Sequence, residues 1–240
     1  MARKGKLNKK KSKIGDIERP PRSKKYKYLI LIVCEDQGTE PYYFKQYKER
    51  FESLLPDETV YLRTYGTGRD SLGVVNKAIE FRELLSEEAE GKVVDQTWAV
   101  FDKDDHDLNP KKIERFEKAF KLAEDSNIRV AYSNECFELW LLLHFDNVER
   151  TSSIPRQKIY KKLESYVVNN IKSDFTYEHG HKDIIDIIKE HGDQTQAIIR
   201  AQELHKYHDE INHTPLESNP NTLMYRLILE LESQYEYYSY

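Results

Sequence analysis

The fold is decided by Thr97-Trp-Ala-Val-Phe-Asp102-Lys-Asp104-Asp-His106, an apolar run that ends in three aspartates and a histidine. Its aromatic and β-branched residues predict a strand buried on both faces, and Asn109-Pro110 predicts the start of the next helix. Ligands of open α/β sheets bind at such carboxyl ends of strands. Because alternate residues of an extended segment point the same way, we expect Asp102 and Asp104 to converge on one Mg²⁺. An acidic turn that caps the helix is the other interpretation.

A second buried strand is predicted at Tyr28-Leu-Ile-Leu-Ile-Val-Cys34, and it too is followed by acids, Glu35-Asp36. A helix follows, with Thr39 as its expected N-cap and aromatic residues at helical spacing. Two strands of one sheet would then both end in carboxylates. Glu35, Asp102 and Asp104 together form the ligand set of a hard divalent ion.

The rest of the sequence also alternates between strand and helix patterns, which favours the same fold. Residues 59–65 and 127–132 read as strands, each beside a helical pattern. Between the first of these and its helix lies Gly66-Thr-Gly-Arg69-Asp-Ser71, a loop that can hold a phosphate with Arg69 as charge partner, or is an ordinary turn. Strand and helix alternate four times, which predicts an α/β fold with a mainly parallel sheet and helices on both faces.

An apolar helix is expected over Ser133–Phe145, with Glu138 near its start. A buried carboxylate needs a partner, so Glu138 is a candidate metal ligand, an acid that steers a ligand, or an acid favoured by the helix dipole or an arginine. Glu135 is a weaker candidate. His144 is more often a core histidine than a catalyst.

Three blocks carry a family resemblance: Cys34-Glu35 with Gly38-Thr-Glu40-Pro-Tyr-Tyr-Phe44, Phe101-Asp-x-Asp104-x-His106, and Asn134-x-Cys-Phe-Glu138-Leu-Trp-Leu-Leu-Leu-His144-Phe145. Together they resemble the RloB family, whose core is similar to the Toprim domain. The sequence departs from the family at Asp36, where glycine is usual, and at Glu135, where proline is frequent.

The resemblance implies a Rossmann-like fold in which Glu35, Asp102 and Asp104 bind Mg²⁺ (or Mn²⁺) for phosphoryl transfer. Apart from the resemblance, Glu40 and His144 are candidates for residues that support these ligands. RloB-like proteins are associated with restriction and phage-defence loci, often beside an ABC or AAA-type ATPase, and related Toprim proteins act as nucleases. An effector of antiviral defence by abortive infection is therefore expected.

Strand patterns are absent after residue 151, where helices are expected at 156–170, 181–191, 194–212 and 221–237. We therefore expect a basic arm (1–25), a Toprim-like domain (26–150) and a helical extension (151–240). Most histidines of the extension are interpreted as surface residues, because no pair of them comes with an acidic partner at a recognised metal-ligand spacing.

Charge is distributed unevenly. Residues 1–27 hold 12 Lys and Arg against Asp16 and Glu18, a net charge of +10, and the chain as a whole carries −4, so the remainder carries −14. The arm is too polar to fold alone and is expected to contact nucleic-acid phosphates, or to serve solubility. The apolar runs are too short for a membrane span and no secretory signal is visible, so a cytoplasmic protein is expected. Cys34 and Cys136 are expected to be buried thiols.

Two functions remain open. One is a Mg²⁺-dependent nuclease of RNA, tRNA included, or of DNA, in which Glu35 or His106 manages protons and Lys103 or Arg69 grips phosphate. The other is a non-catalytic nucleic-acid-binding or adaptor subunit that docks onto the ATPase. DNA or RNA as substrate and homo-oligomer formation are left open.

Overall fold

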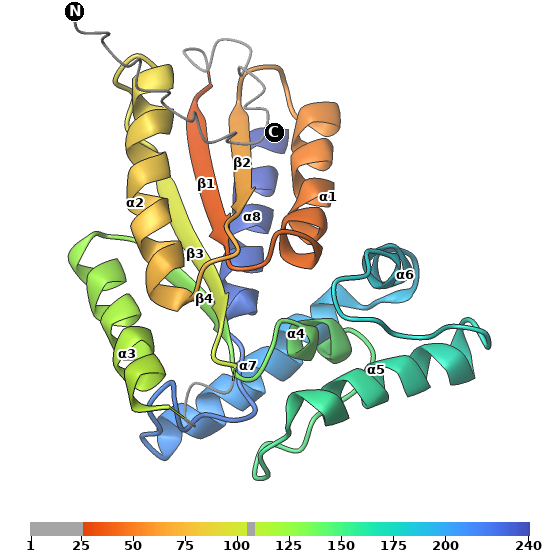
Figure 1. The fold of residues 1–240 in the computed structure, drawn as a ribbon. Helices are drawn as coiled ribbons and strands as arrows, with labels where there is room; N and C mark the ends of the chain where they lie inside the picture. The colour runs from red at the N-terminus through yellow and green to blue at the C-terminus, as the bar shows by residue number, and fades with distance from the viewer. Residues whose placement is uncertain (1–25, 105–108) are drawn as a thin grey trace, which may run out of the picture.

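The computed structural model describes residues 26–104 and 109–240. Its sheet has four parallel strands in the order β2-β1-β3-β4 (Figure 1). The strands are β1 (Tyr28–Cys34), β2 (Val60–Gly66), β3 (Gln96–Asp102) and β4 (Arg129–Ser133). The predicted α/β fold with a parallel sheet is confirmed.

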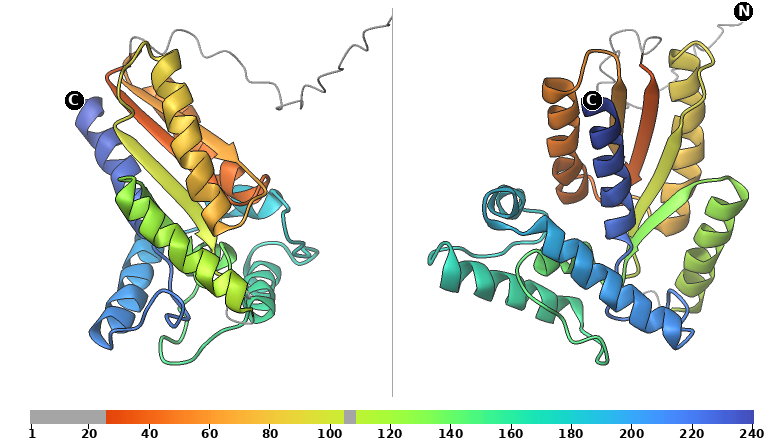
Figure 2. Two further views of the ribbon diagram at one scale, coloured as in Figure 1. Left: turned by 60° about the vertical axis from the view of Figure 1, so that its left-hand side comes forward. Right: turned by 180° about the vertical axis from the view of Figure 1, so that it is seen from behind.

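Helices cover both faces of the sheet (Figure 2). One face carries α1 (Thr39–Leu54) and α8 (Met224–Ser239), and the other carries α2 (Ser71–Glu88) and α3 (Pro110–Asp125). This two-sided cover explains why the central strand β1 is apolar throughout, since every residue from Leu29 to Cys34 is fully buried.

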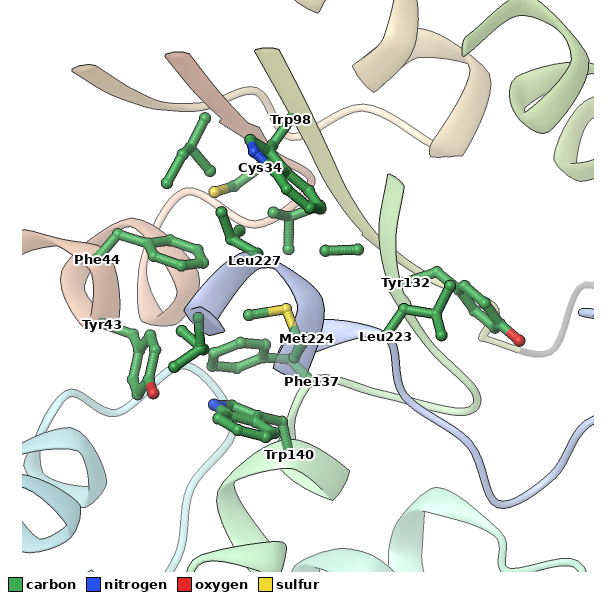
Figure 3. Close-up of a cluster of buried hydrophobic side chains, with 14 of the residues drawn as sticks. Cys34, Tyr43, Phe44, Trp98, Tyr132, Phe137, Trp140, Leu223, Met224 and Leu227 are labelled. Carbon is green, nitrogen blue, oxygen red and sulfur yellow. The ribbon is translucent and has the colours of Figure 1, made fainter. Parts of the chain in front are cut away.

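The core on the α8 side joins the sheet to the C-terminal part of the chain. Trp98 of β3 lies near Met224 and Leu227 of α8, and Phe137 and Trp140 close the cluster from below (Figure 3). Helix α8 therefore packs on the sheet, although the sequence pattern placed it in the helical extension. A backbone hydrogen bond holds the start of α8 beside β4, since Leu223 N donates to Tyr132 O (2.8 Å).

The other C-terminal helices gather at the carboxyl end of the strands (Figure 1). They are α4 (Glu138–Leu143), α5 (Arg156–Asn170), α6 (Asp183–His191) and α7 (Gln194–Glu210). Helix α4 is shorter than the helix expected over Ser133–Phe145, because Ser133 ends β4 and Asn134 N donates to Asn221 O (2.8 Å). The helical part of the chain thus lies against the edge of the sheet at which β1 and β3 end. This edge, where Glu35, Asp102 and Asp104 are found, is called the acidic edge.

Across the two described stretches, no helix combines the length and the apolar character needed to cross a membrane.

Candidate functional site

The two acidic strand ends lie side by side. Strands β1 and β3 are neighbours, and beyond β1 the pairing continues as Glu35 N donates to Val100 O (2.9 Å). The carboxylate of Glu35 then turns back, and its Oε2 accepts from the backbone N of Asp102 (3.1 Å). The sheet register therefore places Glu35 directly beside the end of β3.

The glycine loop after β2 braces the end of β1. Thr67 N donates to Cys34 O (3.0 Å) and Gly68 N donates to Glu35 O (2.8 Å). The loop approaches so closely that a Cβ at Gly66 would lie 2.6 Å from Cα of Gln37, so glycine is required there. Arg69 is exposed within this loop, and its contact with phosphate stays a prediction.

Helix α1 begins at the same edge. Thr39 is not the N-cap, as had been expected from the sequence: it is the first helical residue, and Asp36 Oδ2 accepts from its backbone N (2.5 Å). This hydrogen bond explains why position 36 carries a residue with a polar side chain. Glu40 is buried in the first turn, where its Oε2 accepts from Asp36 N (3.1 Å), so its side chain helps to fix the turn that follows Glu35.

Asp104 lies in a turn and not in the strand. The prediction that Asp102 and Asp104 share one extended segment is wrong, because β3 ends at Asp102 and the backbone of Asp104 is left-handed (φ 50°). The turn is held by Asp104 N, which donates to Glu135 O (3.2 Å). The carboxylate of Asp104 forms an ion pair with Arg156, the first residue of α5.

Lys103 points into the protein. Its side chain is 3% exposed, and its Nζ lies 3.7 Å from Oε1 of Glu135. This burial contradicts the prediction that Lys103 contacts a substrate phosphate. The lysine instead balances Glu135, which is buried beside the turn of Asp104.

Glu138 is buried at the start of α4, as the sequence predicted. Its Oε1 accepts hydrogen bonds from the hydroxyl of Tyr177 and from Nδ1 of His179, the latter at 3.1 Å. Burial opposes its charged form, but these two bonds outweigh it and lower the pKa of Glu138. Its other oxygen, Oε2, has no hydrogen-bond partner among the described residues.

Three carboxylates of the acidic edge have raised pKa values, because they are buried close to one another. Burial and the repulsion of Asp104 raise the pKa of Glu35 to about 8. Burial also raises the pKa of Asp102 well above its usual range, and the further contributions come from Glu40, Asp104, Glu35 and Glu138. The pKa of Glu40 is raised by burial and by Glu35. Carboxylates that repel one another in this way favour the uptake of a proton or a cation.

The donor chemistry fits a hard divalent cation, because carboxylate oxygens are its preferred ligands and one buried oxygen, Glu138 Oε2, lacks a partner within the described ranges. The side chains do not already form a closed ligand group: across residues 26–104 and 109–240, no three His, Cys, Asp or Glu side chains are arranged to hold a metal ion. Asp104 in particular is held by Arg156. An ion that binds Asp104 would therefore compete with Arg156 for this carboxylate.

Of the two histidines predicted for the site, His106 lies outside the described residues. His144 is buried in the core, with its Nδ1 3.0 Å from Trp140 O and its ring edge-on to Tyr43 and Trp140. Burial lowers the pKa of His144 to about 4. These contacts agree with the core interpretation, and they give His144 no contact with the carboxylates of the edge.

Sequence reasoning missed Arg156, Tyr177 and His179. Arg156 follows Pro155 at a predicted helix start, so its position was predictable, but no pattern pointed to its partner 52 residues earlier. His179 was grouped with the surface histidines, and its side chain is indeed 62% exposed, yet it contacts the buried Glu138.

Comparison with known proteins gives one match. The sequence model of a family described as RloB-like protein matches residues 30–231, which include the whole acidic edge and the helices packed below it. Neither curated proteins nor solved structures gave a match.

Proposed function

Because the chain belongs to the RloB-like family, we propose that it is a Mg²⁺- or Mn²⁺-dependent nuclease that hydrolyses phosphodiester bonds of RNA, tRNA included, or of DNA. The observation that carries the proposal is the group of carboxylates at the carboxyl edge of the sheet, where burial and mutual repulsion raise the pKa values of Glu35, Glu40 and Asp102. Without a bound cation, the repulsion between these carboxylates lowers the stability of the folded protein. Such a loss of stability is typical of functional sites.

In this mechanism Glu35, Asp102 and Asp104 would hold the ion, and Glu138 would be available as a further carboxylate. The bound ion would neutralise charge on the scissile phosphate and lower the pKa of a bound water. The backbone N of Asp102 keeps the carboxylate of Glu35 in place. Glu40 holds the turn after Glu35 through its bond with Asp36 N. Glu35 or His106 moves the proton of the attacking water, and Arg69 is exposed where it can contact a neighbouring phosphate.

An adaptor subunit that docks onto an ATPase is the second candidate. It is favoured by the ion pair between Arg156 and Asp104, which already neutralises one of the proposed ligands. Under this proposal the acids would be structural, and binding of nucleic acid or of the ATPase would be the whole activity.

A double variant, Asp102→Ala with Asp104→Ala, separates the two candidates. If the protein is a nuclease, cleavage is lost while binding to nucleic acid and to an ATPase encoded beside it is retained. If the wild type shows binding to the ATPase as its only activity, and this binding survives in the double variant, the adaptor is supported. We also propose that the protein acts in anti-phage defence by abortive infection; plating of phage on cells that carry the intact or the doubly substituted protein tests this role.

A further inference from the structure

Arg156 reaches the acidic edge from the helical part of the chain. It is the first residue of α5 and follows Pro155. The preceding loop is anchored through Asn219, whose Oδ1 accepts from Ile154 N (3.0 Å) and whose Nδ2 donates to Glu135 Oε1 (3.0 Å). The start of α5 is thereby tied to Glu135, the same residue that holds the turn of Asp104.

Within residues 26–104 and 109–240, the contacts of the guanidinium group do not use all of its donors. Nη2 makes the ion pair with Asp104 Oδ1 and also donates to Glu135 O (3.3 Å). Nε is buried and has no hydrogen-bond partner in the described part of the chain. The side chains of Arg156 and Asp104 are 23% and 33% exposed, so both can be reached from solvent.

These contacts conflict with a role of Asp104 as a metal ligand, because one carboxylate would have to serve both Arg156 and the ion. We infer that Arg156 exchanges partners: it neutralises Asp104 in the metal-free protein and binds a substrate phosphate once a divalent ion has taken Asp104. This inference rests on the proposed nuclease function. Arginine suits the exchange, because its planar fork pairs equally well with carboxylate and with phosphate and stays charged throughout. It would also provide the phosphate contact that buried Lys103 does not.

The test compares Arg156→Gln and Arg156→Lys with Arg50→Gln. Arg50 is a suitable control because it is 33% exposed and forms a 2.8 Å ion pair with Glu232 between α1 and α8. Three quantities are measured on the full chain: the rise in melting midpoint caused by Mn²⁺, the binding of mixed-sequence RNA and DNA oligonucleotides in Ca²⁺, and cleavage in Mg²⁺.

For Arg156→Gln we expect cleavage to fall by about 100-fold and oligonucleotide binding to weaken. The Mn²⁺-induced rise in midpoint should be at least as large as in the wild type, because the competitor for Asp104 is gone. Arg156→Lys should recover part of the binding, since it restores the charge without the fork. Arg50→Gln should match the wild type in all three measurements.

Two results would overturn the exchange while leaving the nuclease intact. One is unchanged cleavage and binding in Arg156→Gln. The other is a Mn²⁺ response that shrinks together with cleavage, which would mean that Arg156 only supports the ligand geometry. A wild-type protein with neither a Mn²⁺ response nor cleavage would overturn the proposed function, and the exchange with it.

Discussion

Replacing Glu35 by Gln should make the metal-free protein more stable at alkaline pH. The folded protein raises the pKa of Glu35 from 4.5 to about 8, chiefly through burial and then through the charge of Asp104. Below pH 4.5 the carboxyl is protonated in both the folded and the unfolded chain, so it does not affect stability there. As the pH rises from 4.5 to 8, the unfolded chain ionises first, and the free energy of unfolding of the wild type falls.

The size of the expected gain in stability follows from this pH interval. At about 1.4 kcal/mol per pH unit, the interval from 4.5 to about 8 corresponds to roughly 5 kcal/mol for a fully buried carboxyl. Glu35 is half-buried and water screens part of its charge, so we expect Glu35→Gln to gain about 2 kcal/mol over the wild type at pH 8.5. In a chain of this length such a gain raises the melting midpoint by about 4 to 8 °C. At pH 4.5 the two proteins should melt together.

The assay is thermal or urea unfolding in EDTA between pH 4.5 and 8.5, repeated in millimolar Mg²⁺. The ion favours ionised Glu35, so in Mg²⁺ the wild type should regain the stability that it loses with rising pH. Glu49→Gln is the control, because Glu49 is exposed on α1 and forms a surface ion pair with Lys45 across one helical turn (3.3 Å). A difference between Glu35→Gln and the wild type that does not change with pH would refute the argument that this carboxyl lies in an uncompensated site.

Three further predictions can be checked on purified protein. Millimolar Mg²⁺ or Mn²⁺ should raise the melting midpoint of the wild type, because only the folded chain brings the carboxylates together; an unchanged midpoint over a wide concentration range would speak against the site. Deleting residues 1–25 should weaken nucleic-acid binding and flatten its dependence on salt, as the arm supplies mobile positive charge; an unaltered slope would assign the arm to solubility or to a protein partner. Tyr177→Phe should lower the free energy of unfolding by about 2 kcal/mol, because it removes a hydrogen bond from buried Glu138, whereas Tyr42→Phe on the surface should change it little; equal effects in chemical denaturation would contradict this account of Glu138.

The sheet was predictable because its signals are local. Each buried strand is an apolar run, and the acids that follow β1 and β3 mark where those strands end. Parallel strands of one sheet end at the same edge, so the sequence predicted that Glu35 and the end of β3 lie at one edge. That β1 and β3 are direct neighbours is a finding of the structure.

The finer geometry was not predictable, because it depends on contacts between distant segments. Asp104 leaves the extended conformation where its backbone bonds to Glu135, and a period-two pattern does not reveal such a turn. The side chain of Arg156 reaches the site only because α5 folds back below the sheet. Lys103 is buried for the same reason, since its partner Glu135 belongs to the loop after β4.

The central claim is that the acidic edge cleaves nucleic acid with the help of a divalent ion. Its most direct test is incubation of the wild type and of Asp104→Asn with labelled duplex DNA, single strands and tRNA in Mg²⁺, Mn²⁺ and EDTA, with a melting curve for each protein. We predict that the wild type cleaves at least one of these substrates in metal and none in EDTA, and that Asp104→Asn is folded but inactive, because the amide keeps the shape of the ligand and removes its charge. Cleavage that persists in EDTA, or full activity of Asp104→Asn, would contradict the account.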